Sequence, residues 1–136
     1  MLYAEGVADY EAMATTKEFR EGLERVIDGA HRHRIALMCS EQDPLDCHRC
    51  LLIGRALSQR GVQVNHLLAN SRTMSHSDIE QELLRLMGRD GEDLLMSPDQ
   101  RLAAAYRERA LKVAFHRRSA KTGELVAATP DNGAEC

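Results

Sequence analysis

Apolar residues recur every three or four positions in four stretches of the chain, which is the spacing of helices with one buried face. Capping boxes support the boundaries, because Ser or Thr followed three residues later by Glu or Gln satisfies free N–H groups at a helix start. Such pairs are Thr15 with Glu18, Ser77 with Glu80, and Ser97 with Gln100. The predicted helices cover residues 15–32, 47–60, 77–88 and 97–114, after a short helical turn at Asp9–Ala14.

Two shorter stretches have the character of strands. Ile35–Cys39 is a continuous apolar run, which after a helix predicts a buried parallel strand. Val62–Leu68 alternates apolar and polar residues and is rich in β-branched side chains, as half-buried strands are. With the helix between them, these strands would make one βαβ unit. We therefore expect an α/β fold that is helix-rich, with a small, incomplete parallel sheet and flanking helices.

The predicted sheet has too few strands to be complete. Both edges of a two-stranded parallel sheet would stay unpaired. We therefore expect a marginally stable chain, or a homodimer that forms through a sheet edge. A single domain should cover residues 1–118, and a disordered tail should follow at 119–136, where no periodicity is visible.

Composition excludes several classes of protein. The 136 residues include 18 Lys and Arg against 21 Asp and Glu, for a formal net charge of -3, so there is no strong signal for nucleic-acid binding. No apolar run has the length of a membrane span, and the N-terminus lacks the pattern of a signal peptide. We expect a cytoplasmic protein whose thiols are reduced.

Three of the four cysteines lie in one segment, "LMCSEQDPLDCHRC", residues 37–50. Cys47 and Cys50 have the C-x-x-C spacing of a thiol redox pair at a helix start, where Cys47 would be activated. A zinc site could use Cys39, Cys47, His48 and Cys50. The direct adjacency of Cys47 and His48 disfavours that site, and no second ligand pair lies nearby. We therefore expect no metal, and the sequence indicates no cofactor.

The same segment also has the features of an anion-binding turn. It leads into a helix whose free N–H groups, together with the planar fork of Arg49, would favour a phosphate or a carboxylate. His48 would transfer protons near neutral pH, and Glu41 would serve as acid, base or nucleophile. The crevice beyond the C-terminal end of a parallel strand is also where open α/β sheets bind ligands.

Each residue of the segment has a purely structural explanation as well. Asp43 or Asp46 would cap the helix, Pro44 would shape the turn, and Cys39 and Cys50 would pack as small core residues. The remaining histidines are expected at the surface or in structural hydrogen bonds rather than as ligands: His31, His33, His66, His76 and His116.

The string "DYEAM...FREGLERV...IALMCSEQDPLDCHRCLLIGRALSQRGVQVNHL" resembles the domain of unknown function 488 family, which has a similar "MC-x-E-x-x-P-x-x-CHR" turn. With "DLLMSPDQRLAAAYRERALKVAF", the resemblance covers about residues 8–116. It is to the C-terminal portion of the family, since "TIGHS"-like and "DVR"-like first strands do not occur here. The resemblance implies no settled activity. The residues of this chain that match the family's turn are Cys39, Glu41, Pro44, Cys47, His48 and Arg49.

These observations predict an enzyme-like domain that binds an anionic, nucleotide-like small molecule at the Cys39–Arg49 turn. His48, Glu41 and Cys47 are the catalytic candidates, and Arg49 would bind the anion together with Cys47 and His48. A non-catalytic binding module, or a truncated remnant that needs a partner, is the alternative. Thiol redox through Cys47 and Cys50 is the third. The structural residues of the turn would be Cys39, Asp43, Pro44 and Asp46.

Overall fold

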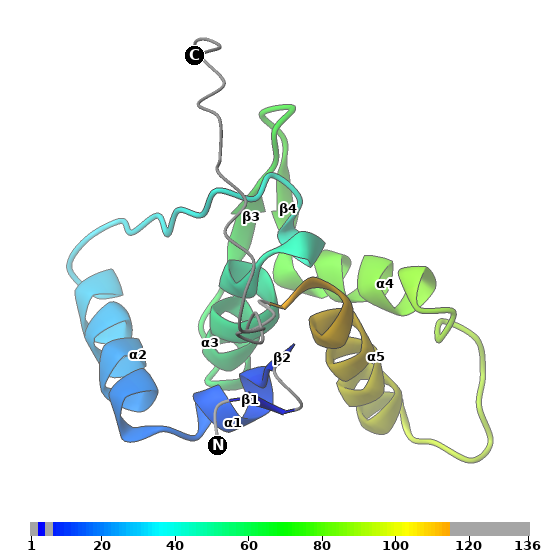
Figure 1. The fold of residues 1–136 in the computed structure, drawn as a ribbon. Helices are drawn as coiled ribbons and strands as arrows, with labels where there is room; N and C mark the ends of the chain where they lie inside the picture. The colour runs from blue at the N-terminus through cyan, green and yellow to red at the C-terminus, as the bar shows by residue number, and fades with distance from the viewer. Residues whose placement is uncertain (1–2, 5–6, 115–136) are drawn as a thin grey trace, which may run out of the picture.

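The computed structural model describes residues 3–4 and 7–114. They form a helix-rich α/β chain with small antiparallel sheets (Figure 1). The expected tail at 119–136 lies outside the described residues. The elements in chain order are β1 (Tyr3–Ala4), β2 (Val7–Ala8), α1 (Tyr10–Ala14), α2 (Lys17–Ala30), the 3-10 turn η1 (Pro44–Asp46), the π-helix η2 (Arg49–Gly54), α3 (Arg55–Gln59), β3 (Asn65–Leu67), β4 (Thr73–Ser75), α4 (His76–Leu86) and α5 (Pro98–Val113).

All the predicted helices are present, and local capping determines where they begin. The capping box of α5 is confirmed: Gln100 N–H donates to the Ser97 hydroxyl, and Ser97 N–H donates to the Gln100 side chain. At α4 the cap is Ser75 rather than the predicted Ser77, and at α2 it is Thr16 rather than Thr15. In both helices a nearby hydroxyl residue caps the helix instead. The predicted helices are therefore confirmed, but their predicted first residues are not.

The predicted helix at residues 47–60 is divided between two helical geometries. Arg49–Gly54 is π-helical and Arg55–Gln59 is α-helical. The chain then ends the helix at Gly61, whose φ of 76° lies in the left-handed region that favours glycine. Short π-helical turns widen a helix locally and occur often at functional sites.

The sheet is antiparallel, so the prediction of a parallel sheet is wrong. Strand β3 pairs with β4, with Asn65 opposite Ser75. The backbone N–H of Leu68 donates to the carbonyl of Arg72 at 2.8 Å, which closes a short hairpin turn. Strands joined by so short a connection can pair only antiparallel, because a parallel pair needs a crossover of a dozen residues or more.

The predicted strand at Ile35–Cys39 is an irregular connection, so the βαβ unit is absent from the described residues. Figure 1 shows this connection running between α2 and the turn η1 without joining a sheet. Within the described part of the chain, residues 34–42 make no backbone–backbone hydrogen bond. The side chains of Ile35 and Met38 are 45% and 92% exposed. An apolar run becomes a strand only where another strand can pair with it.

The hydrophobic core lies where η2, α4 and α5 meet, rather than against a sheet. It is built by seven buried residues: Leu45, Cys50, Leu51, Ile79, Leu83, Ala105 and Tyr106. Polar side chains that point into this helix-lined core are therefore removed from water and need partners within the protein. None of the helices described is both long and apolar enough to cross a membrane.

Candidate functional site

The segment from Cys39 to Cys50 is anchored by the C-terminal helix. Asp43 accepts a hydrogen bond from the backbone N–H of Leu45 at 2.9 Å and so caps the turn η1. From α5, Arg109 donates to the Leu45 carbonyl at 2.8 Å and pairs with the carboxylate of Asp46. Pro44 and Leu45 are buried. These contacts give the turn a defined position relative to α5.

Cys39, Cys47 and His48 come together at this turn. Their two sulfur atoms and a ring nitrogen all lie within 4.8 Å of one another. Cys47 is fully buried, Cys39 is half-buried and His48 is exposed. The Cys47 Sγ accepts a hydrogen bond from the backbone N–H of Arg49 at 3.3 Å. Three of the four residues considered for zinc are thus adjacent, whereas the fourth, Cys50, belongs to a different group.

The pKa values of the thiols differ from the expectation that Cys47 is activated. The Cys47 side chain and the backbone N–H of Glu41 favour the thiolate of Cys39 and lower its pKa. Burial raises the pKa of Cys47, and Arg49 offsets only part of that effect. Burial also raises the pKa of Cys50, to about 12. Of these three thiols Cys39 is therefore the most easily ionised, because hydrogen bonds favour its thiolate, whereas burial disfavours the thiolates of Cys47 and Cys50.

Arg49 is the one half-buried arginine of the described chain whose side chain makes no hydrogen bond or ion pair with the described residues. It nevertheless lies close enough to act electrostatically on several groups. The half-buried arginines that do have partners are Arg55, Arg89, Arg101 and Arg109. The groups that Arg49 influences are Cys39, Cys47, Cys50 and His66.

A hollow of about 450 Å³ borders the same turn. It lies between residues 42–45 and the loop of the β3–β4 hairpin, and Asp43 and Glu82 are among its lining residues. Arg49 is not one of them. Carboxylates at its wall would repel a second negative charge. An anion at this turn would therefore bind on the Arg49 side and not in the hollow.

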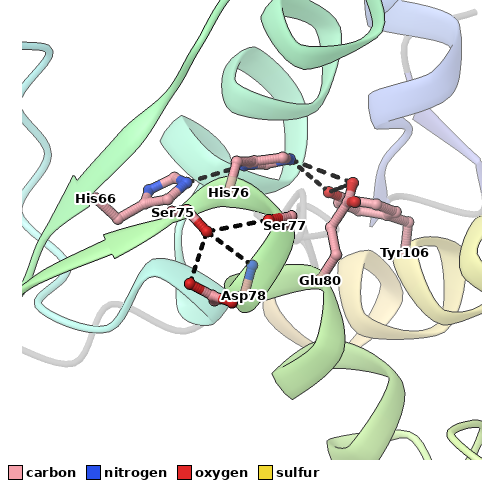
Figure 2. Close-up of polar contacts among 7 residues, drawn as sticks. All are labelled: His66, Ser75, His76, Ser77, Asp78, Glu80 and Tyr106. Atoms are coloured by element: carbon pink, nitrogen blue, oxygen red, sulfur yellow. Dashed lines mark hydrogen bonds and ion pairs between the residues drawn. The ribbon is translucent and has the colours of Figure 1, made fainter.

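A second polar group was not predicted from the sequence. Figure 2 shows His66, His76, Glu80 and Tyr106 in one line from β3, through α4, to α5. Nitrogen Nε2 of His66 lies 2.9 Å from Nδ1 of His76, and Nε2 of His76 lies 2.8 Å from the hydroxyl of Tyr106. Tyr106 donates in turn to Glu80 at 2.8 Å. Because its hydroxyl proton goes to Glu80, Tyr106 accepts from His76 Nε2–H, which leaves Nδ1 of His76 with a lone pair.

Burial determines the charge state along this line. Burial, with contributions from His76 and Arg49, lowers the pKa of His66 to about 4. Burial would raise the pKa of Glu80, but hydrogen bonds from His76 and Tyr106 outweigh it, so that the pKa is lower than usual. Burial raises the pKa of Tyr106. Near neutral pH the line therefore holds a neutral His66 at one end and a charged Glu80 at the other.

The π-helix η2 brings Cys50 and Gly54 against His76. Cys50 Sγ and ring nitrogens of His66 and His76 all lie within 4.8 Å of one another. At Gly54, an added Cβ would lie 3.2 Å from Cε1 and 3.3 Å from Nδ1 of His76. The close approach of η2 to the imidazole thus depends on the absence of a side chain at Gly54.

One sequence signal could have identified His66 as inward-facing. In the alternating stretch at residues 62–68, His66 shares its face with apolar residues that are partly shielded from water: Val62, Val64 and Leu68. A histidine on the apolar face of a strand needs a partner inside. No comparable periodicity marks His76, which directly follows β4 at the helix start.

Comparison with known proteins identifies a family but no function. The family model described as "Domain of unknown function DUF488" matches residues 2–56. This corrects the expectation that the resemblance covers residues 8–116 and is to the C-terminal portion of the family, since the match lies in the N-terminal part of this chain. No curated protein and no solved structure matches. Through residues 2–56, which include the Cys39–Arg49 turn, this chain is similar to the DUF488 family.

Proposed function

We propose that the Cys39–Arg49 turn binds a small anionic molecule of the phosphate or nucleotide class in an enzyme-like site. The observation that carries this proposal is the half-buried Arg49 beside the thiols, whose side chain has no hydrogen-bond or ion-pair partner among the described residues. A guanidinium that gives up part of its hydration without a carboxylate partner is available to a ligand. Its planar fork matches the oxygen atoms of a phosphate.

The catalytic roles in this proposal are divided among three side chains. His48 is exposed at the same turn and can exchange protons with a bound molecule, and so can the exposed Glu41. Cys39 takes the role of nucleophile that the sequence suggested for Cys47, because its pKa is lowered while that of Cys47 is raised. The side chain of Cys47 then stabilises the thiolate of Cys39 by a hydrogen bond.

The experiment is a titration of the full chain with inorganic phosphate and with a nucleotide, followed by backbone amide NMR shifts. We expect shifts at residues 47–49. Arg49→Ala should weaken binding by about 1.5–3 kcal/mol, the range for a charge-assisted hydrogen bond. Arg85→Ala is the matched control, since Arg85 is exposed and pairs with Glu82 on α4. Equal weakening in both variants, or shifts confined to α3, would contradict the proposal.

A specific observation also favours a partner-binding module. Residues 34–42 make no backbone–backbone hydrogen bond with the rest of the described chain, and Ile35 and Met38 are exposed. An extended apolar segment of this kind can add a strand to a second sheet. In this alternative a second copy of the chain pairs along Ile35–Cys39 and forms a homodimer.

Light scattering at several protein concentrations tests the dimer. Met38→Asp should shift the chain toward monomer, because a charge would be buried on pairing. Leu94→Asp is the control, since Leu94 is 100% exposed in a different connection. A wild-type chain that stays monomeric at all concentrations would eliminate this alternative. Phosphate binding without turnover of any phosphate ester would favour a binding module over an enzyme.

Thiol redox through Cys47 and Cys50 loses support. Cys50 is grouped with two buried histidines, and its pKa is raised to about 12, so it would attack a disulfide slowly. Cys39 and Cys47, whose sulfur atoms lie within 4.8 Å, make the better pair for any disulfide.

A further inference from the structure

Three side chains with metal-ligating atoms converge inside the molecule, away from the Cys39–Arg49 turn. They are Cys50 from η2, His66 from β3 and His76 from α4, with their ligating atoms within 4.8 Å of one another. They are only 0%, 4% and 3% exposed. One thiol and two imidazoles in a buried cluster, each from a different element, are an uncommon use of core space, because polar groups are costly to bury.

The surroundings of His76 are those of a metal ligand. Its Nε2 lies 2.8 Å from the hydroxyl of Tyr106 and 3.4 Å from a carboxylate oxygen of Glu80. Histidines that bind metals almost always donate their other ring N–H to such an outer group, which orients the ring and makes it more basic. The lone pair on Nδ1 is thereby directed toward His66 and Cys50.

We propose that Cys50, His66 and His76 bind a zinc-class divalent metal ion, with Glu80 and Tyr106 as its outer shell. One sulfur and two nitrogens are a ligand set that zinc accepts, and three protein ligands leave a fourth position for a further ligand. The negative charges of the Cys50 thiolate and Glu80 would balance the charge of the ion. This site is independent of anion binding at Arg49, and either can exist without the other.

Metal binding requires a definite movement of protons. Nε2 of His66 lies 2.9 Å from Nδ1 of His76. Because His76 donates its Nε2–H to Tyr106, His66 Nε2–H is the donor in this contact. To expose both lone pairs, His66 must shift its proton from Nε2 to Nδ1, and Cys50 must release its thiol proton. The thiol proton of Cys50 should therefore leave the protein when the metal ion binds.

The turn offers a competing group, Cys39, Cys47 and His48, whose ligating atoms also lie within 4.8 Å. His48 is exposed, and within the described residues no carboxylate is bonded to it. An ion bound there would lack the outer shell that His76 has. Any experiment must therefore distinguish the two groups.

The experiment adds Co²⁺, as a coloured substitute for Zn²⁺, to the reduced full chain. We expect one equivalent to give a thiolate-to-cobalt charge-transfer band, which Cys50→Ala removes and Cys39→Ala keeps. Glu80→Gln should lower the affinity 10- to 100-fold without changing the stoichiometry, as loss of an outer carboxylate does. The opposite pattern, with the band lost in Cys39→Ala and kept in Cys50→Ala, would overturn the proposal.

A second measurement uses the wild-type chain, so its result does not depend on whether a variant folds. Zn²⁺ is added to the ¹⁵N-labelled wild-type chain, and the ring nitrogens of the histidines are followed by NMR. We expect Nε2 of His66 to change from a protonated to a metal-bound nitrogen. If saturating Zn²⁺ leaves the rings of His66 and His76 unchanged, the cluster is a hydrogen-bonded core and the proposal is wrong.

Discussion

Gly54→Ala tests whether η2 positions His76. Gly54 has helical dihedral angles, φ -59° and ψ -44°, so alanine is compatible with the backbone. Replacing a helical glycine by alanine usually stabilises a protein by about 0.5–1 kcal/mol, because the unfolded chain has less freedom to lose. Backbone conformation alone therefore predicts that Gly54→Ala stabilises the folded chain.

The atoms around Gly54 predict instead that Gly54→Ala lowers the free energy of unfolding. The new Cβ would lie 3.2 Å from Cε1 of His76 and 3.3 Å from the carbonyl oxygen of Arg49. Favourable contacts between carbon atoms begin at about 3.5 Å, so a neighbour must move by a few tenths of an ångström. The carbonyl belongs to the helix backbone, and His76 is held by His66 at 2.9 Å and by Tyr106 at 2.8 Å. Overpacking of this kind costs about 1–3 kcal/mol, so we expect a net loss of about 1 kcal/mol.

Urea unfolding followed by circular dichroism measures this loss. Gly22→Ala in α2 is the matched control, since an added Cβ there meets no atom within 4 Å. It should stabilise the chain by about 0.5–1 kcal/mol, which leaves a difference of about 2 kcal/mol between the variants. If Gly54→Ala is as stabilising as Gly22→Ala, His76 is free to move, and the packing of η2 against it is not a constraint.

Three further predictions concern the buried groups. With a chelator present, His66 should destabilise the chain as the pH falls from 6.5 toward its folded pKa of about 4. The unfolded state then binds the extra proton first, so up to about 3 kcal/mol is lost, and His66→Gln should flatten the urea-midpoint profile over that range. Mass spectrometry after alkylation at pH 7 should find Cys39 modified well before Cys50, whose pKa is about 12, and equal rates would contradict the burial argument. Tyr106→Phe should lower the unfolding free energy by about 1–2 kcal/mol by removing the donor to Glu80, whereas an unchanged urea midpoint would mean that water replaces the hydroxyl.

The proposed anion site and the proposed metal site occupy separate places in this chain. Cys39 and Cys47 lie at the Cys39–Arg49 turn, whereas Cys50 lies three residues after Cys47, with the buried histidines. The C-x-x-C spacing suggested one site, but Cys47 precedes η2 whereas Cys50 lies within it, and the two thiols have different surroundings. Burial then raises the pKa of Cys50 to about 12, whereas hydrogen bonds lower the pKa of Cys39. The spacing of two cysteines along a helix therefore does not determine whether they act together.

The sequence by itself determined the features that depend on neighbours within a few residues. The capping box of α5, the helical turn after Asp9 and the glycine at the end of α3 are all local, since side chain and backbone partners lie within four residues. The helices were therefore predictable, with errors of one or two residues where another hydroxyl could do the capping.

Only the tertiary structure decided the sheet and the buried cluster. Ile35–Cys39 has the composition of a strand, but a strand requires backbone partners from elsewhere, and the described residues provide none. The line from His66 to Tyr106 joins residues up to 40 positions apart in the sequence. Their side chains meet because η2, β3, α4 and α5 pack around one core. Such convergence depends on long-range packing, which no local pattern of apolar and polar residues specifies.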